Sequence, residues 1–385
     1  MRVLMLPSFY GYPGKEHIGV FFKDQALAIK KVGIQVDILY VESRTLRDLS
    51  VGSFKDSHFQ IVETIEDGIL TIRQKGWNTA VSTSIGGYCW SVLTIRLVGY
   101  YIERYGCPDL IHAHNIFWAG YAAVCISKKY QVPYIVSEHS SAFLLGEIPQ
   151  KLFGTVTSVC RRASKVIAVS KSLANAVNAN LKHSDVEIEV VPNVIDTEYF
   201  TLPSTEPHSK PFIFLAVANL NKNKGLHILI QAFEKAFRNQ SDVLLHIGGE
   251  GPQREELIAL VVKLGIIDRV HFLGYLKRSQ VRDAMWRAHV FVLSSFKETF
   301  GVVLIEALAT GLPIVTTRSG GPEDIVTIET GLLVSPGDVK DMSLALTRMH
   351  NKIINLRSEL RSYAVNGYSQ KYVGNKIAEI YRSIL

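Results

Sequence analysis

Cysteine is scarce in this chain: there are four cysteines among 385 residues, and no two of them form a C-x-x-C pair. Such sparse spacing argues against a small secreted scaffold held together by disulfides. We therefore expect the four thiols to be reduced and mostly buried in a cytoplasmic protein.

Long apolar runs are also missing. The nearest candidate, Ile85–Tyr101, is interrupted by Arg96 and by several glycines and polar residues, so it falls short of the ~20 apolar residues that a membrane span needs. The segment Arg2–Leu6 reads as a first strand rather than as the apolar region of a signal peptide. Both observations predict a cytoplasmic protein.

Charge of either sign is moderate, with 42 Lys and Arg against 35 Asp and Glu and a net charge of +7. An excess of this size suits an anionic ligand but gives no indication of nucleic-acid binding. One stretch is locally basic: Lys128, Lys129, Lys151, Arg161, Arg162, Lys165, Lys171 and Lys182. It is either a solvated surface or a peripheral contact with anionic lipid on the inner face of the cell membrane.

Two common ligand motifs are missing as well. The segment Pro7–Gly11, which follows the first strand, is not G-x-G-x-x-G, and this argues against a dehydrogenase. No D-x-D motif ends a strand, since Asp185, Asp283 and Asp324 are isolated. We therefore expect no cofactor and no metal ion.

The sequence does contain short apolar runs that alternate with longer amphipathic stretches. Runs that are apolar almost throughout are typical of parallel strands buried on both faces. Their alternation with helices predicts two doubly wound, Rossmann-like α/β domains. The runs are Val3–Leu6, Gln35–Leu39, Leu110–His112, Tyr134–Val136, Val166–Val169, Ile188–Val191, Phe212–Val217, Val243–Ile247, Val270–Leu273, Val290–Leu293, Ile314–Thr316 and Leu332–Val334.

A proline-rich segment, Thr201–Pro211, separates two of these runs and reads as an interdomain linker. It divides the chain into domains 1–200 and 212–367. After its first strand, the second domain has a helix whose apolar residues, from Leu226 to Phe237, follow the spacing of one buried helix face.

The strongest chemical signal is the segment Ser295–Ala307, where a strand ends and a helix begins near Gly301. Helix starts offer free N–H groups and attract phosphate, and glycine lets a ligand approach the backbone closely. Glu298 and Glu306 could accept hydrogen bonds from sugar or ribose hydroxyls. The alternative is a charged helix cap and a buried glutamate without a ligand.

These residues form an E-x7-E segment that resembles the signature of the retaining glycosyltransferase family 4, which has the GT-B fold. Other segments resemble the same family in its order and spacing, and together they extend over nearly the whole chain. They are Pro192–Asp196, Asn219–Gly225, Gly248–Pro252, His271–Tyr275, Glu306–Pro313 and Gly320–Asp324.

The resemblance implies that the second domain binds the donor, a nucleoside-diphosphate sugar. Lys224 would neutralise the diphosphate, and the backbone N–H groups of Val302 and Val303 would hold the distal phosphate. Phe300 and Gly301, which precede them, would also contact the donor. Glu306 would bind ribose hydroxyls, and Glu298 would act as a catalytic residue on the hydroxyls of the transferred sugar. Tyr275 would flank the base, although a partly buried structural tyrosine is an alternative.

The chain departs from the family at Asn219, where an arginine usually pairs with the lysine on the diphosphate. Val194 also replaces a common glycine. With Asn219, stabilisation of the leaving group rests on Lys224, on neighbouring cations such as Lys222, and on helix N-termini.

In the first domain, the resemblance identifies His139 as a catalytic residue that orients a sugar hydroxyl or stabilises an oxocarbenium-like transition state. A strand-end histidine with only a structural role is the alternative. Gly19, in the loop Gly11–Gly19, would lie near the phosphate unless this loop is an ordinary connection. His112 and His114 point to the same side of one strand, and we expect them to serve packing and hydrogen bonding.

The implied activity is transfer of a hexosyl-type sugar, with retention, to a hydroxyl of a saccharide or lipid-linked acceptor in cell-surface polysaccharide synthesis. The C-terminal helix, 368–385, would cross back onto the first domain, and closure about the linker would exclude water. Two alternatives remain: a sugar-nucleotide epimerase on the same fold, and a non-catalytic scaffold that binds nucleotide sugars.

Overall fold

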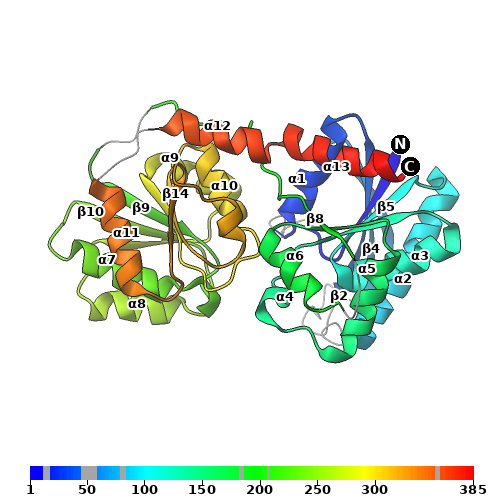
Figure 1. The fold of residues 1–385 in the computed structure, drawn as a ribbon, viewed down its shortest axis with the longest axis horizontal. Coiled ribbons are helices and arrows are strands. Elements are labelled where there is room, and N and C mark those ends of the chain that lie inside the picture. Colours follow the sequence, from blue (N-terminus) through cyan, green and yellow to red (C-terminus); the bar gives the residue numbers. More distant parts are fainter. Residues whose placement is uncertain (12–17, 45–58, 79–83, 182–185, 206–208, 352–355) are drawn as a thin grey trace. The chain divides into compact units, whose positions relative to one another are not determined.

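Two separate sheets organise the computed structural model, which describes residues 1–11, 18–44, 59–78, 84–181, 186–205, 209–351 and 356–385 (Figure 1). The chain divides into a first unit, Met1–Val194 with Gln370–Leu385, and a second unit, Ile195–Ser369. In each unit helices follow the strands, so the predicted pair of doubly wound α/β domains is confirmed.

Within its described residues, the first unit has an eight-stranded sheet in the order β3-β4-β2-β1-β5-β6-β7-β8. Its strands are β1 (Arg2–Pro7), β2 (Gln35–Arg44), β3 (Ile61–Glu66), β4 (Ile69–Trp77), β5 (Leu110–His114), β6 (Tyr134–Glu138), β7 (Lys165–Ala168) and β8 (Ile188–Val190). Its helices are α1 (Val20–Lys31), α2 (Ser84–Tyr105), α3 (Tyr121–Tyr130), α4 (Ala142–Leu145), α5 (Phe153–Arg162), α6 (Lys171–Asn178) and α13 (Gln370–Ile384).

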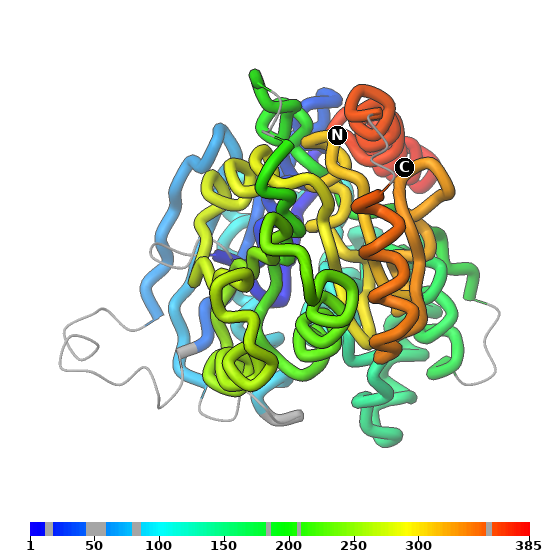
Figure 2. The backbone as a smooth tube through the Cα atoms, turned by 90° about the vertical axis from the view of Figure 1, so that its left-hand side faces the viewer, coloured from blue at the N-terminus to red at the C-terminus, as the bar shows by residue number. Residues whose placement is uncertain are grey.

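The second unit has six parallel strands in the order β11-β10-β9-β12-β13-β14, counted over the part of the chain that the structure describes. They are β9 (Phe212–Val217), β10 (Val243–Gly248), β11 (Val270–Gly274), β12 (Val290–Leu293), β13 (Ile314–Thr317) and β14 (Gly331–Val334). The helices are α7 (Leu226–Phe237), α8 (Arg254–Lys263), α9 (Arg278–Arg287), α10 (Val302–Ala309), α11 (Val339–Asn351) and α12 (Arg357–Tyr368). Figure 2 shows the backbone turned by 90° from the view of Figure 1.

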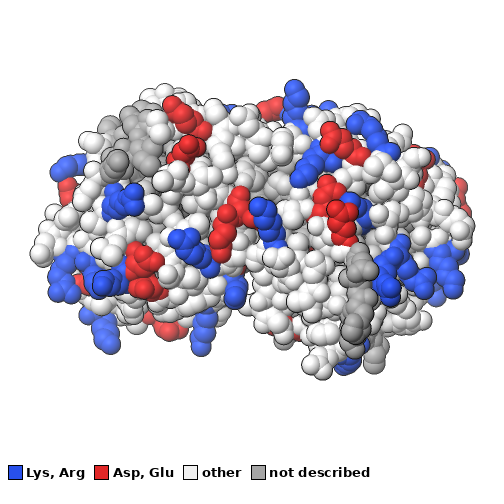
Figure 3. Space-filling view, viewed as in Figure 1, with Lys and Arg blue, Asp and Glu red and all other residues white. Residues whose placement is uncertain are grey.

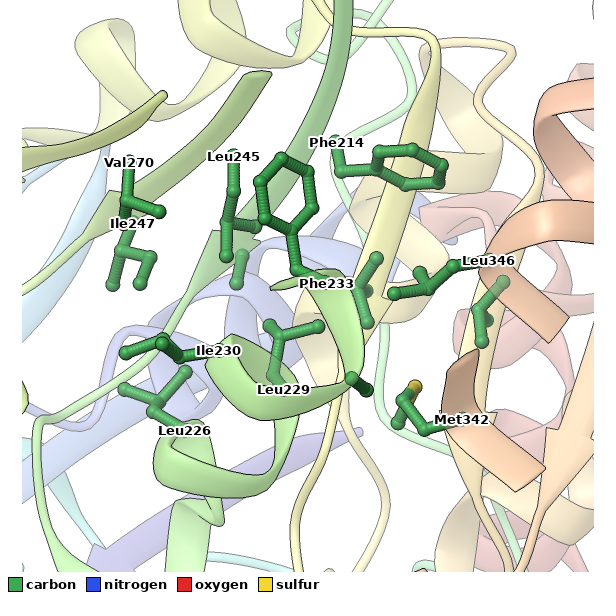
Figure 4. Close-up of a cluster of buried hydrophobic side chains, with 14 of the residues drawn as sticks. Phe214, Leu226, Leu229, Ile230, Phe233, Leu245, Ile247, Val270, Met342 and Leu346 are labelled. Atoms are coloured by element: carbon green, nitrogen blue, oxygen red, sulfur yellow. The ribbon is translucent and has the colours of Figure 1, made fainter. Parts of the chain in front are cut away.

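The core of the second unit shows why α7 forms where the sequence predicts it. Its apolar face packs on side chains of β9 and β10 and reaches α11, as Figure 4 shows for Phe233, Leu245 and Met342. Burial of one such side chain contributes roughly 1.5–3 kcal/mol. This packing fixes the start of α7 at the carboxyl edge of the sheet.

One edge of the first sheet differs from the expectation of parallel strands only. β3 and β4 form an antiparallel hairpin, and Asp67 and Gly68 at its turn both have positive φ angles (48° and 74°). Asp-Gly at such a turn is a hairpin signal. Neither strand was predicted from the sequence. The side chains of β3 are only partly buried or exposed, and polar residues from Arg73 to Lys75 interrupt β4, so neither strand is a continuous apolar run.

The division between the units lies at Val194, before the expected linker Thr201–Pro211. Residues up to Phe200 are held in the second unit, because the guanidinium group of Arg361 donates to the carbonyls of Thr197 (2.8 Å) and Phe200 (2.7 Å). The ring of Phe200 is also fully buried. The described residues 201–205 and 209–211 therefore lie inside the second unit.

The cysteines differ in part from the expectation. All four are free thiols, but Cys89 and Cys107 are exposed, and only Cys160 is fully buried. The run Ile85–Tyr101 lies within α2. Among the helices that the structure describes, none is both long enough and apolar enough to cross a membrane.

Candidate functional site

Two loops meet at the carboxyl edge of the second sheet, because β9 and β12 are neighbours. The short 3-10 turn Lys222–Lys224 follows β9, and the segment Ser294–Gly301 follows β12. Asn223 joins the two loops: its side chain donates to the carbonyl of Lys297 (2.8 Å) and accepts from the N–H of the same residue (3.1 Å). The N–H of Phe296 also donates to the carbonyl of Asn223 (2.7 Å).

Gly225 allows this close approach. Its φ is 59°, and a Cβ atom at this position would lie 2.2 Å from the carbonyl oxygen of Ser294. Any other residue would meet both a strained backbone and a steric clash. The glycine therefore fixes how Lys224 is presented next to the loop after β12.

Lys224 and Glu298 form an ion pair at this corner, with Nζ 2.6 Å from Oε2 and side chains 21% and 14% exposed. The backbone of Glu298 is fixed on both sides: its N–H donates to Ser319 (2.9 Å), and its carbonyl accepts from Gly321 (2.8 Å). The pair thus offers a well-positioned cation and a carboxylate that remain partly accessible.

The helix α10 begins at Val302, four residues beyond Glu298. Gly301 precedes the helix with a φ of 91° and has no side chain that could cap the first turn, and the first turn itself contains no acidic residue. The N–H groups at this helix start carry partial positive charge and favour an anion. Val302 and Val303 are half-buried there, and Glu306 lies one turn further along the helix, also half-buried.

The other residues expected to bind the donor lie at the same edge of the sheet. Asn219 follows β9 and is exposed, and Tyr275 follows β11 with 53% of its side chain exposed. Phe300 differs, because its ring is only 2% exposed and packs against Tyr368 at 5.9 Å between ring centroids. Only the backbone of Phe300 is therefore available to a ligand.

A groove of about 720 Å³ lies between α7 and α8. Asn223, His227 and Phe296 line it, together with residues of α8, but Lys224, Glu298 and the start of α10 do not. The groove is therefore separate from the ion pair, although Asn223 belongs to both surroundings.

In the first unit, Gly19 follows β1 and His139 follows β6, with β5 between these two strands of the sheet. Gly19, with a φ of 65°, precedes α1, while residues 12–17 of the loop Gly11–Gly19 lie outside the described residues. The rings of Phe21 and Phe22 lie 5.1 Å from that of His139. The first turn of α1 and the end of β6 are thus packed together.

His139 is uncharged in this setting. Burial lowers its pKa to about 3, although a hydrogen bond to Asn193 acts in the opposite direction. Its Nε2 lies 3.1 Å from Nδ1 of His114. A neutral imidazole can orient a hydroxyl group but supplies no positive charge to a transition state.

Glu138 is a residue that the sequence reading missed. Its buried carboxylate accepts backbone N–H groups of Ile116 (2.8 Å), His139 (2.9 Å) and Ser140 (2.6 Å). Burial raises its pKa to about 7, and the three hydrogen bonds limit that rise. The available signal was a glutamate at the end of an apolar strand, where it must find buried donors.

The locally basic stretch is divided by the topology. Lys128 and Lys129 end α3, and Arg161 and Arg162 end α5, so these cations lie near the amino ends of β6 and β7, away from His139. Lys165 pairs with Glu187 and Glu189, and Lys182 lies outside the described residues. On the face drawn in Figure 3, basic and acidic side chains are interspersed.

Two family models match the chain in succession. Residues 18–199 match "Glycosyltransferase Family 4", and residues 201–366 match "Glycosyl transferases group 1". The second match contains Lys224, Glu298 and Glu306, and the first contains Gly19 and His139.

Among curated proteins, the chain is 28% identical over 259 residues to the glycogen synthase of Mycobacterium tuberculosis. This match covers 66% of the chain and 62% of that synthase, so the chain spans less than two thirds of its length. A putative teichuronic acid biosynthesis glycosyltransferase, TuaC, of Bacillus subtilis is 26% identical over 92% of this chain and 90% of its own.

Solved structures with the same fold include the sucrose-phosphate synthase of Thermosynechococcus elongatus, with a TM-score of 0.79 at 20% identity. That comparison covers 100% of this chain and 99% of the synthase. Anabaena HepE in complex with UDP and glucose gives a TM-score of 0.75 at 21% identity, covering both chains completely.

Proposed function

Since the chain belongs to the group 1 glycosyl transferases with the GT-B fold, we propose that it transfers a glycosyl group from a nucleoside-diphosphate sugar to an acceptor hydroxyl. The donor binds to the second unit and the acceptor to the first.

The observation that carries this proposal is the Lys224–Glu298 pair beside the uncapped start of α10. A diphosphate needs cations and N–H donors, which Lys224, Val302 and Val303 supply. Carboxylates accept hydroxyl hydrogen bonds, so Glu306 binds the ribose and Glu298 binds the transferred sugar. Lys224, Glu298, Glu306 and the start of α10 lie at the carboxyl edge of one parallel sheet, where α/β proteins commonly bind nucleotides.

The reaction breaks the bond between the anomeric carbon and the diphosphate and forms a bond from that carbon to the acceptor oxygen. The diphosphate leaves with the bonding electron pair, and the acceptor hydroxyl passes its proton to an oxygen of the departing diphosphate. Lys224 and the start of α10 stabilise the developing negative charge. We propose that the acceptor attacks from the face that the diphosphate leaves, with retention of configuration, as the E-x7-E segment suggests.

His139 contributes as a neutral group in this scheme. Because burial keeps the pKa of its imidazole at about 3, it orients a hydroxyl and does not provide a charge. A neutral ring is better suited to orienting a sugar hydroxyl than to stabilising an oxocarbenium-like transition state.

The acceptor is a saccharide or a lipid-linked saccharide in this proposal, and polysaccharide assembly is the process. The name of TuaC refers to teichuronic acid biosynthesis, and HepE was crystallised with UDP and glucose. UDP-glucose is therefore the first donor to test.

We also propose that the exposed cations at the ends of α3 and α5 contact anionic lipid. Cosedimentation with phosphatidylglycerol vesicles tests this contact. Binding should weaken when Arg161 and Arg162 are both changed to glutamate, and phosphatidylcholine vesicles should bind neither form. Equal binding of both forms to anionic vesicles would contradict the contact.

Product analysis with a panel of nucleotide sugars and saccharide acceptors tests the main proposal. Transfer should require both substrates, persist in EDTA, and fall strongly in Lys224→Ala and Glu306→Ala. Conversion of the donor without an acceptor would instead support an epimerase, and nucleotide binding without turnover would support a scaffold. The anomeric configuration of the product, measured by NMR, tests retention.

A further inference from the structure

His112 is held from both sides inside the first unit. Its Nδ1 lies 2.7 Å from the hydroxyl of Tyr381 on α13, and its Nε2 lies 2.7 Å from the hydroxyl of Ser137 on β6. The side chains of His112 and Tyr381 are fully buried, and that of Ser137 nearly so. A buried ring with both nitrogens bound has one orientation available to it.

The ring of His112 in turn supports that of His114. The two rings stack with 4.2 Å between centroids and an angle of 30°. Nδ1 of His114 then lies 3.1 Å from Nε2 of His139. A continuous series of contacts therefore runs from α13, through β5, to the histidine at the end of β6.

The protonation states of these side chains determine which atoms donate hydrogen bonds and which accept them. Burial lowers the pKa of His112 to about 3 and that of His114 well below its ordinary value, so both rings are neutral. Burial also raises the pKa of Tyr381, which keeps its hydroxyl protonated. A phenol is a stronger donor than an aliphatic hydroxyl, so Tyr381 donates to Nδ1 of His112, and the Nε2–H of His112 donates to Ser137.

We propose that Tyr381 is a positioning residue for His139, acting through the clamped ring of His112 and the stacked ring of His114. Its effect on turnover rests on the proposed function of His139, whereas its effect on the histidine rings does not.

The C-terminal helix is well suited to this task. It packs against α1 in the core of the first unit, where Val373, Ile377 and Tyr381 are buried together with Phe22 and Ile29. A rigid helix that holds the hydroxyl of Tyr381 fixes the far end of the series, since positioning requires a support that does not move.

NMR of the full chain with ¹⁵N-labelled histidine tests the positioning directly. In Tyr381→Phe, the side-chain signals of His112, His114 and His139 should shift, because the loss of one hydroxyl frees His112 to change tautomer. Tyr134→Phe is the matched control, since Tyr134 is also buried and donates to the carbonyl of Val159 (2.6 Å), outside the series. Its histidine signals should stay in place. If Tyr381→Phe left the signals of His114 and His139 unchanged, the proposal would be wrong.

Kinetics separate the positioning from the catalytic role. With a working donor and acceptor, Tyr381→Phe should lower kcat by roughly tenfold to a hundredfold, the range that lost positioning causes. The Kd of the nucleoside diphosphate should stay the same, because its site lies in the second unit. Equal losses of kcat in Tyr381→Phe and Tyr134→Phe would overturn the proposal.

Ser137→Ala provides a second variant if Tyr381→Phe does not fold. It removes the other clamp of His112 and should shift the same histidine signals. If the signals shift as expected but no donor is turned over by the wild type, the positioning stands and the proposed function fails.

Discussion

Lys224 and Glu298 are separated by 74 residues in the sequence, yet their side chains meet at 2.6 Å at the carboxyl edge of one sheet. The contact depends on the pairing of β9 with β12 and on the bonds of Asn223 that join the two loops. A diphosphate that approaches Lys224 therefore competes with Glu298 for the same ammonium group. Release of Glu298 would leave its carboxylate available to sugar hydroxyls.

We expect Glu298→Gln to lower kcat by about a hundredfold or more, the scale of loss when one polar contact to a transition state is removed. The affinity for the nucleoside diphosphate without sugar should not decrease, because Lys224 loses a competing carboxylate. Titration calorimetry and initial rates measure the two effects separately, and Glu255→Gln on the exposed side of α8 is the control. Parallel losses of affinity and turnover would contradict this assignment of Glu298.

The stability of the first unit should decrease in acid. The folded-state pKa values of His112 and His139 are about 3, below the ordinary 6.5, so the unfolded chain takes up protons first as the pH falls below 6.5. Each of these groups then removes about 2 kcal/mol of unfolding free energy at pH 5. Burial also depresses the pKa of His114, which acts in the same direction.

Glu138 opposes this trend, because its raised pKa of about 7 adds stability as the carboxyl becomes protonated and loses it as the pH rises through 7. The stability that Glu138 gains between pH 7 and pH 5 is about equal to the stability that one of the histidines loses. The unfolding free energy of the first unit should therefore still decrease. Urea unfolding at pH 7 and pH 5 measures the difference, which should be smaller in His139→Gln. An unfolding free energy that is equal or larger at pH 5 would show that these rings are not buried and neutral.

Two glycines with similar backbone angles should differ in their tolerance of a methyl group. Gly225 (φ 59°) faces the carbonyl of Ser294 at 2.2 Å, whereas Gly265 (φ 68°) has nothing within 4 Å of an added Cβ. Gly265→Ala should cost about 1 kcal/mol for the left-handed backbone. Gly225→Ala should cost a further ~1–3 kcal/mol for the steric clash. Denaturant midpoints compare the two variants, and equal midpoints would contradict the close approach of the loops.

Much of the fold could be read from the sequence. The apolar runs from Val3–Leu6 to Leu332–Val334 all coincide with parallel strands. Central strands such as β1, β5 and β12 are buried on both faces, which is why they are apolar almost throughout. The start of α7 at Leu226 was also predicted correctly, since its apolar face follows the helical period. β3 and β4 were both missed. The side chains of β3 are only partly buried at the edge of the sheet, and the polar residues from Arg73 to Lys75 interrupt the apolar pattern of β4.

Only those features of the candidate site that lie within one continuous segment of the sequence could be predicted. Gly301 and the carboxylates on either side of it belong to one continuous segment, so their spacing could be read directly. The contact of His112 with Tyr381 joins residues 269 positions apart, and no local pattern announces it. Phe300 was expected to contact the donor because it precedes Gly301. The structure places its ring in the core against Tyr368, which leaves only its backbone for such a contact.

Equilibrium binding of nucleoside diphosphates tests whether the donor diphosphate binds at Lys224. The uridine, guanosine, adenosine, cytidine and thymidine compounds should be titrated into wild type, Lys224→Ala and, as the control, Lys263→Ala at the end of α8. We expect the tightest ligand to lose roughly tenfold to a hundredfold in affinity in Lys224→Ala, the cost of one charged hydrogen bond, and to lose nothing in Lys263→Ala. Unchanged affinity in Lys224→Ala would contradict this expectation.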